Sequence, residues 1–579
     1  MKTPSNSTHL SFFLLLILSC SSAAFADRQD NFLKCLSKTS NYSYFSNDVY
    51  TPANSSYTSI LQFSIRNLRF ASLSTPKPQV IITPEHESQI PPVIRCARQS
   101  RLEIRTRSGG HDMEGLSYVS RVPFVVLDLI NLSEVTINVE KKTAWIEAGA
   151  TTGIVYYKIA KKSPTLGFPG GICPTVGVGG HYSGGGYGTL LRKYGLAGDN
   201  VIDARIINTN GIILDRKSMG EDLFWAIRGG GGASFGVITA WKVQLVDVPK
   251  TVTVFSINRN VEQQNGTELW HRWQYVVPQA DKDLFVGVIV SRVNTTVQVN
   301  FFSVFLGGAD SLFSYMQEIF PELGLKREDC LEMSWIRSTL FSNQMPINPL
   351  ETLLNRTQAG LRQLKAKSDY VRTPIPLNAI KGMVTLLREL EADETIYYMV
   401  PYGGRMGEIP ESQTPFPHRA GVLYKLAGLT YWQNAKAANA SSYISWSRRY
   451  YQYMTPYVSS SPREAYYNYR DLDIGVNNPN GKTSYARASI WGKPYYKDNF
   501  DRLVRVKTVV DPTNFFKNEQ SIPNTGSTDM GVGEDAHEQT GSSIAQVEES
   551  KYVVVAPYKR PRGQTRPRDQ FADYVPDKS

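Results

Sequence analysis

Two glycine-rich stretches each carry a side chain that can act as a nucleophile. His111 lies directly after Gly109 and Gly110 in the stretch RTRSGGHDMEGLSY. Cys173 lies in FPGGICPTVGVGGHYSGGGYG, which spans 168–188 and holds nine glycines. Glycine loses much conformational entropy on folding, so such density is typical of backbone that passes close to something. The pattern predicts a large ligand held between two loops.

Several kinds of site compete for these residues. The dinucleotide fingerprint G-x-G-x-x-G fails, because counting from Gly177 places Tyr182 where the last glycine belongs. No histidines pair as HxH or HExxH, and Cys173 and His181 have no acidic neighbour, so we expect no metal site. A cysteine protease stays a weak alternative, since little near Cys173 could orient a base. The remaining interpretation is that His111 and Cys173 attach a flat cofactor.

The N-terminus predicts export. Residues 1–26 read as a signal peptide, with a charge at Lys2, an apolar run and small residues before cleavage. No later apolar run reaches the roughly 18 residues that a membrane span needs, so we expect no stable membrane anchor. In an oxidising compartment Cys35 and Cys96 can form a disulfide. Cys330 reads as a free, partly buried thiol in a helical segment.

Glycosylation motifs and charge agree with an extracellular protein. The predicted N-x-S/T acceptors are Asn41, Asn54, Asn265, Asn294, Asn355 and Asn439. Asn131 also begins such a motif, but it follows the apolar run VVLDLI, so we expect it to be buried and unmodified. The net charge is +11, but the basic residues are scattered and no helix concentrates them. We therefore expect no nucleic-acid partner and at most adhesion to an acidic matrix.

The order of elements predicts several units around the glycine stretches. A lead-in at 27–75 precedes 76–250, where short strands and helices alternate, and Asn210-Gly211 predicts a hairpin turn. Residues 251–461 read as antiparallel strands covered by helices, and 462–523 as a polar, aromatic C-terminal segment. The tail at 524–579 is rich in Gly, Ser, Pro and charge, so we expect disorder there.

Together these motifs resemble one family. R-S-G-G-H-D-x-E-G-x-S-Y and G-x-C-P-T-V-G-V-G-G-H-x-S-G-G-G-Y-G are similar to motifs of the berberine bridge enzyme-like flavoproteins of plants, within the vanillyl-alcohol oxidase type of FAD-linked oxidases. The resemblance covers about 31–523 and includes PYGGRMGEIPES, NYRDLDIG and DPTNFFKNEQSIP. It implies an α+β fold of two domains. These are an FAD-binding domain of the PCMH type at 76–250 and an antiparallel-sheet substrate domain at 251–461, with 462–523 returning to the FAD domain.

The resemblance also implies how FAD is held. His111 would be bonded to the 8α-methyl group of the flavin ring and Cys173 to its C6. His181 would lie near the pyrimidine end, where a hydrogen-bond donor favours the reduced ring. Val176 matches the family's oxygen gate and implies reoxidation by O2 to H2O2. The other implied cofactor contacts are Ser108, Gly109, Gly110, Ser117, Gly179 and Gly180.

On the substrate side the resemblance implies tyrosines over the flavin. Tyr187, Tyr466 and Tyr469 match the family positions, and Lys425 matches a cation beside them. A tyrosine with a pKa near 10 is a poor base at neutral pH, whereas a nearby cation would lower that pKa. We therefore expect Tyr469, helped by Lys425, to deprotonate a substrate hydroxyl during hydride transfer. The alternative is that these tyrosines merely line a cleft.

Two departures from the family bear on the substrate. Met113 stands where relatives often have tyrosine or a small residue. Lys425 is followed by Leu426, Ala427 and Gly428, where many relatives that oxidise monolignols or sugars read K-x-Q-Y. The missing glutamine leaves a roomier, more apolar pocket, in which the Ala427 region would decide the substrate. This favours a prenylated phenol or an alkaloid over a monolignol or a carbohydrate.

The sequence therefore predicts a secreted, monomeric FAD oxidase. It would remove hydride from a plant specialised metabolite, with or without ring closure, and its partners would be that small molecule and O2. Three alternatives stay open: a cycloaddition-type cyclase on the same fold, a monolignol or carbohydrate oxidase, and a binding or defence protein without turnover. The expected location is the apoplast, cell wall or vacuole.

Overall fold

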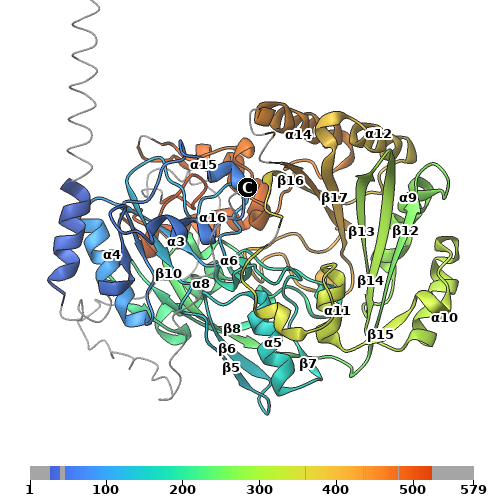
Figure 1. Ribbon diagram of the computed structural model, residues 1–579, viewed down its shortest axis with the longest axis horizontal. Helices are drawn as coiled ribbons and strands as arrows, with labels where there is room; N and C mark the ends of the chain where they lie inside the picture. Colours follow the sequence, from blue (N-terminus) through green and yellow to red (C-terminus); the bar gives the residue numbers. More distant parts are fainter. Residues whose placement is uncertain are drawn as a thin grey trace, which may run out of the picture.

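The computed structural model describes residues 27–39, 46–358, 360–433, 436, 439–479 and 481–524. The predicted signal peptide, the acceptor Asn41 and the predicted disordered tail from residue 525 onwards lie outside the described residues. The described chain forms two lobes, which Figure 1 shows side by side.

The first lobe is built on two sheets. One has four strands in the order β1-β2-β4-β3, with β2 and β3 both parallel to β4. The other is antiparallel, with five strands in the order β5-β6-β10-β8-β9. The strands are β1 (Val49–Tyr50), β2 (Val80–Ile82), β3 (Glu103–Arg107), β4 (Phe124–Asp128), β5 (Val135–Asn138), β6 (Thr143–Glu147), β8 (Val201–Ile207), β9 (Ile213–Leu214) and β10 (Val237–Gln244). β7 (Leu166–Gly167) pairs with β11 (Val246–Asp247).

The first lobe also contains several helices. α5 begins where the side chain of Thr151 accepts a hydrogen bond from the backbone N–H of Ile154, an N-cap that satisfies a free donor. The prolines of α4 stand in its first turn, where no intrahelical N–H bond is lost. The helices are α3 (Tyr57–Phe63), α4 (Ile90–Gln99), α5 (Thr152–Lys162), α6 (Val178–Ser183), α7 (Leu191–Tyr194) and α8 (Arg216–Ile227), with a further helix at 27–37.

The second lobe is a seven-stranded antiparallel sheet in the order β15-β12-β14-β13-β17-β18-β16. Its strands are β12 (Val252–Asn260), β13 (Leu284–Val293), β14 (Thr296–Phe305), β15 (Leu331–Met333), β16 (Gln363–Val371), β17 (Glu394–Pro401) and β18 (Tyr424–Trp432). Four helices cover its outer side in Figure 1, namely α9 (Gly266–Val276), α10 (Ala309–Ile319), α12 (Leu377–Leu387) and α14 (Ala440–Met454). α11 (Trp335–Ser342) packs between α5 and β12. A separate apolar core lies between the sheet and the covering helices.

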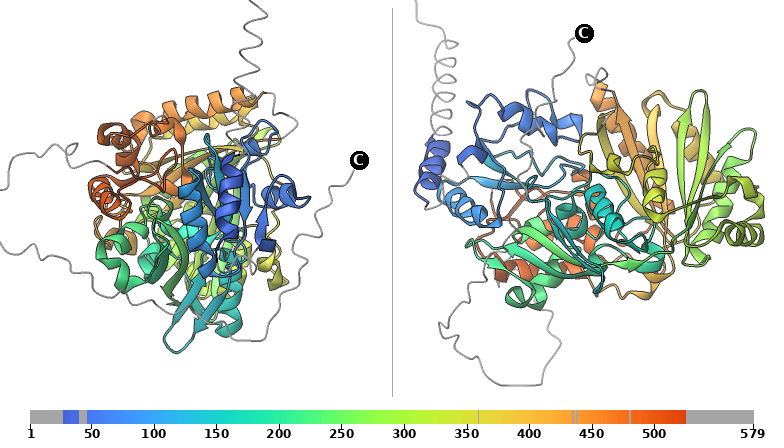
Figure 2. Two further views of the ribbon diagram at one scale, coloured as in Figure 1. Left: turned by 90° about the vertical axis from the view of Figure 1, so that its left-hand side faces the viewer. Right: turned by 60° about the horizontal axis from the view of Figure 1, so that its bottom comes forward.

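The C-terminal segment returns to the first lobe. α15 (Tyr485–Tyr496) and α16 (Asn499–Val510) lie beside elements of the first lobe in Figures 1 and 2, and α16 packs against α8. Phe500 and Leu503 enter the same apolar core as Ile227. The buried Nζ of Lys507 donates hydrogen bonds to the carbonyl of Ser234 and to Asp511. The C-terminal segment therefore packs into the apolar core of the first lobe.

The fold confirms several predictions and corrects one. The α+β architecture with an antiparallel second sheet is as expected, β8 pairs with β9 across Asn210-Gly211, and Cys35 is bonded to Cys96. Cys330 is buried, but the predicted helix around it is wrong. A single 3-10 turn precedes Cys330 and β15 follows it, because pairing with β12 overrides the local helical pattern. The predicted domain boundaries stay predictions.

Two surface properties bear on location. No helix among the described residues is both long and apolar enough to cross a membrane. Asn131, which also begins an N-x-S motif, is half-buried and donates a hydrogen bond to the carbonyl of Thr83. The predicted acceptor asparagines that the structure describes are all exposed: Asn54, Asn265, Asn294, Asn355 and Asn439. These side chains are therefore accessible, as glycosylation requires.

Candidate active site

A cavity of about 530 Å³ lies where the two lobes and the C-terminal segment meet. Both glycine-rich stretches line it, together with β17, β18 and the segment 466–470. Every predicted site residue except Lys425 is among the lining residues. Lys425 contacts the rings of three lining residues, Tyr187, Tyr466 and Tyr469. The fold thus brings together residues that are up to 361 positions apart, from Ser108 to Tyr469.

The two glycine stretches are in direct backbone contact. A Cβ added at Gly109 would stand 2.3 Å from the backbone nitrogen of Gly177, and one added at Gly177 would stand 2.2 Å from that of Gly109. The hydroxyl of Ser108 donates to the carbonyl of Ala148 at 2.5 Å. These glycines are therefore explained by loop-to-loop packing, and not by close approach of a ligand alone as the sequence suggested.

Other positions leave room for a ligand. A Cβ added at Gly180 would meet no described atom within 4 Å. The hydroxyl of Ser117 lies in the cavity wall and is buried without a hydrogen-bond partner among the described residues. An unpaired buried hydroxyl is costly, so such a group marks a position where a polar ligand atom would be stabilised.

His111 and Cys173 lie within reach of one side chain. The Nε2 atom of His111 is 2.9 Å from the hydroxyl of Thr175, and the Sγ atom of Cys173 is 3.7 Å from the same hydroxyl. Burial, followed by the charge of Arg66, lowers the pKa of His111 to about 3. The imidazole is therefore neutral at physiological pH and keeps one nitrogen lone pair.

His181 is neutral as well. Its Nε2 atom accepts a hydrogen bond from the backbone N–H of Gly171 at 2.9 Å, so the ring proton resides on Nδ1. Burial and the charge of Lys425 lower the pKa of His181 to about 4. A neutral imidazole with one free N–H in a cavity wall is a hydrogen-bond donor, which is the predicted role.

Lys425 is enclosed by aromatic rings. Its Nζ atom lies 3.4 Å from the ring centre of Tyr187, 4.0 Å from that of Tyr469 and 4.7 Å from that of Tyr466. The hydroxyls of Tyr187 and Tyr469 are hydrogen-bonded to each other. The hydroxyl of Tyr466 accepts bonds from the backbone N–H of Gly186 and the side chain of Asn468. The four predicted catalytic residues therefore form one cluster.

The expected lowering of the Tyr469 pKa by Lys425 is wrong. Burial raises the pKa of Tyr469 well above its usual value of 10.0, and burial lowers the pKa of Lys425 well below 10.5. Lys425 is fully buried, and Nζ has no hydrogen-bond partner among the described residues. The reason is geometric, because the amine faces ring surfaces and not the Tyr469 hydroxyl. Burial therefore disfavours the charged form of each group, the phenolate of Tyr469 and the ammonium of Lys425.

The second sheet supplies a cavity wall that begins two positions after the predicted Ala427. Leu429 and Tyr431 on β18 and Tyr398 on β17 line the cavity, as does Met113. Ala427 is completely buried and is not among the lining residues, so the prediction that it shapes the pocket is corrected. Strand alternation points Leu429 and Tyr431 to the same side as Lys425 and Ala427, so extending the predicted face along β18 could have identified them.

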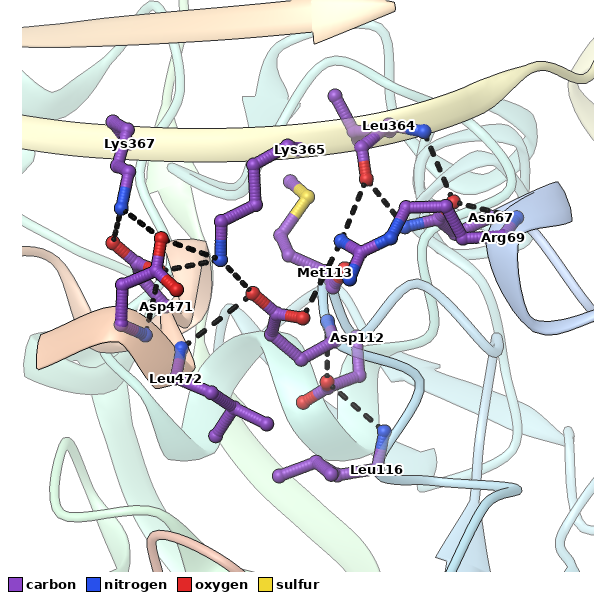
Figure 3. A network of polar contacts seen from close by, with 12 residues as sticks. Asn67, Arg69, Asp112, Met113, Leu116, Leu364, Lys365, Lys367, Asp471 and Leu472 are labelled. Atoms are coloured by element: carbon purple, nitrogen blue, oxygen red, sulfur yellow. Dashed lines mark hydrogen bonds and ion pairs between the residues drawn. The ribbon is translucent and has the colours of Figure 1, made fainter. Parts of the chain in front are cut away.

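A buried charge network holds the site's segments together (Figure 3). Nζ of Lys365 on β16 contacts Glu114 in the His111 stretch and Asp471, two residues after Tyr469, the latter at 2.6 Å. Lys367 on the same strand contacts Asp471 and Asp473, each at 2.6 Å. Buried charges are tolerated when they are paired and hydrogen-bonded. The sequence did not indicate this network.

Known proteins match this chain over most of its length. A family model described as an FAD binding domain matches residues 78–216, and one described as berberine and berberine like matches 465–523. Tetrahydroberberine oxidase of Berberis wilsoniae is 50% identical over 536 residues, covering 90% of this chain and 99% of the relative. The chain belongs to the berberine bridge enzyme-like family.

Solved structures agree with this assignment. The berberine bridge enzyme-like protein number 28 of Arabidopsis thaliana has 46% identity and a TM-score of 0.81, covering 86% of this chain and 100% of that one. The grass pollen allergen Phl p 4, which has glucose dehydrogenase activity, has 44% identity and a TM-score of 0.81, covering 85% and 99%. This family member is an FAD-linked oxidoreductase, as predicted.

The residues present fit FAD. The open position at Gly180, the unpaired hydroxyl of Ser117 and the neutral imidazoles of His111 and His181 all line one cavity. Sequence reasoning missed several further lining residues, because they come from distant elements and carry no motif of their own. They are Arg66, Gln358, Tyr398, Leu429, Tyr431 and Arg470.

Proposed function

We propose that this protein is a secreted FAD oxidase that removes hydride from an uncharged aromatic specialised metabolite, such as a phenol or prenylated phenol, and forms H2O2. The observation that carries the proposal is the cluster of Tyr187, Tyr466 and Tyr469 around Lys425 in the wall of the cavity that also holds His111 and Cys173. Bound FAD would accept the hydride and pass two electrons to O2.

The cofactor would be held by His111 and Cys173 as covalent attachment points. The neutral His111 imidazole has a lone pair available, and the Cys173 thiol is partly exposed at the cavity. Ser117 would donate its free hydroxyl to the cofactor, and the backbone at Gly180 leaves space for it. The Nδ1–H of His181 would stabilise negative charge on the ring.

Tyr469 would take the proton of the substrate hydroxyl at its phenolic oxygen. The hydrogen bond between Tyr187 and Tyr469 orients that oxygen. Burial disfavours the Tyr469 phenolate and the Lys425 ammonium when each is alone, so each charge would stabilise the other. The aromatic rings around Nζ then stabilise the ammonium by cation–π contact. This arrangement supports base catalysis without an acidic residue.

The charges of the cavity support an uncharged substrate. Asp112 is the one carboxylate among the described lining residues, and it is paired with Arg470 at 3.2 Å. A protonated amine would find no unpaired carboxylate there and would be repelled by Arg66. Tyr398, Leu429 and Tyr431 offer aromatic and apolar contact instead. An alkaloid would therefore bind as its free base.

Oxidase behaviour is supported by Val176, which lines the cavity next to the proposed attachment point. The wild-type allergen Phl p 4.0202 is a glucose dehydrogenase, whereas an isoleucine-to-valine variant of Phl p 4 is a glucose oxidase. A valine at the family's oxygen gate agrees with reoxidation by O2. The disulfide and the exposed acceptor asparagines support secretion. The proposed functional unit is a monomer.

The test is anaerobic titration of the purified flavoprotein with a panel of plant phenols, alkaloids and sugars. We expect an uncharged phenol to bleach the flavin, and admission of air to restore its colour with one H2O2 per substrate. The matched control is the same phenol carrying a quaternary ammonium group, which should not bleach it. Product formation without any bleaching would instead indicate the cycloaddition-type cyclase, and bleaching by sugars alone would indicate a carbohydrate oxidase.

A further inference from the structure

Thr175 joins the two proposed attachment points. Its hydroxyl is 2.9 Å from Nε2 of His111, 3.7 Å from Sγ of Cys173 and 3.4 Å from Oε1 of Gln358. Thr175 is 5% exposed, so these side chains and not bulk water are its partners. A hydroxyl between two nucleophiles and an amide oxygen can decide where their protons reside.

The hydrogen bonds fix a direction. The hydroxyl of Thr175 has one hydrogen, and Oε1 of Gln358 can only accept, so Thr175 donates to Gln358. Thr175 can then only accept from His111, which places the imidazole proton on Nε2 and leaves the lone pair on Nδ1. Since His111 carries a single ring proton, the hydrogen bonds from His111 through Thr175 to Gln358 select one of its two tautomers.

We propose that Thr175 is a positioning residue for flavin attachment: its hydroxyl accepts a hydrogen bond from Nε2–H of His111 and so holds the imidazole in the tautomer whose Nδ1 is nucleophilic. The inference rests on the covalent linkage of the proposed function.

O2 is the oxidant in the attachment reaction. Attachment forms a bond between Nδ1 and the 8α carbon of the flavin and breaks one C–H bond of that methyl group. The C–H and Nε2 protons and the two electrons pass to O2, which becomes H2O2.

The experiment compares Thr175→Val, which keeps the shape and loses the hydroxyl, with Thr175→Ser, which keeps the hydroxyl. The full chain is produced with each substitution, and FAD binding before denaturation reports the folded state. Flavin retained after denaturation, and the mass of the peptide containing His111, then report attachment. We expect Thr175→Val to attach flavin at His111 about tenfold more slowly, the effect of one hydrogen bond, and Thr175→Ser to match wild type.

The outcomes separate the two ideas. Wild-type protein without flavin on the His111 peptide would refute the covalent linkage and the inference together. Wild-type protein with the linkage, and Thr175→Val attaching flavin at the same rate, would refute the role of Thr175 alone. If Thr175→Val does not bind FAD, Gln358→Leu tests the inference instead, because it removes the group that accepts the hydrogen bond of the Thr175 hydroxyl. Slower flavin attachment in Gln358→Leu would support the inference. An unchanged rate of attachment would overturn it.

Discussion

Replacing Lys365 by methionine tests whether the buried charge network joins the His111 stretch to the Tyr469 segment. Burial alone would lower the pKa of Lys365, but Asp471 and Glu114 outweigh it and raise that pKa, so the lysine is charged. Methionine would leave Glu114 with Arg69 at 3.4 Å as its remaining ion-pair partner. Removing one partner from a buried ion pair lowers the free energy of unfolding by about 3–5 kcal/mol.

The matched control is Lys367→Met, on the same strand and equally buried. Asp471 would keep Lys365 at 2.6 Å and Asp473 would keep Arg448 at 2.6 Å, so no carboxylate loses its last close partner. We therefore expect Lys367→Met to lower the free energy of unfolding less than Lys365→Met does, by about 1–2 kcal/mol. Glu114→Gln combined with Lys365→Met should cost less than the sum of the single changes, since no uncompensated charge remains.

The assay is thermal unfolding of the flavoprotein, followed by flavin fluorescence and by circular dichroism. We expect Lys365→Met to lower the midpoint by several degrees more than Lys367→Met, and the flavin signal to change first, because the network closes the cofactor cavity. Equal midpoints for the two variants, or strictly additive effects of Lys365→Met and Glu114→Gln, would refute the role of Lys365 as the joining residue.

Four other changes have defined outcomes. Tyr469→Phe should lower kcat about 100-fold or more while substrate still binds, which stopped-flow flavin reduction measures. Val176→Leu should slow reoxidation by O2 and leave flavin reduction unchanged. Gly180→Ala should weaken FAD binding, seen by titrating apoprotein, without lowering the midpoint of the apoprotein, because its Cβ meets space that only the cofactor would fill. Burial and Glu85 raise the pKa of Asp48 from 3.8 to about 6, so the folded protein binds this proton more tightly than the unfolded chain. Wild type should therefore lose stability relative to Asp48→Asn as pH rises from about 4 to 7, and parallel unfolding curves would contradict this.

The sequence alone identified the family, the cofactor and the two cofactor-facing loops. It could do so because His111, Cys173 and their glycines lie in short, continuous motifs whose spacing is local. The Asn210-Gly211 hairpin was predictable for the same reason, since a turn depends on adjacent residues. The Cys330 segment was not, because pairing between β15 and β12 determines its conformation.

Tertiary structure decided the electrostatics and the substrate wall. Lys425 and Tyr469 were predictable as neighbours, but the shifts of their pKa values follow from burial, which depends on the packing of both lobes. Likewise Thr175 meets Gln358 from 183 positions away, and Lys365 meets Glu114 from 251. Residue types and spacing along the chain determine which chemistry is available, whereas desolvation and contacts between distant segments determine how each group is protonated and held.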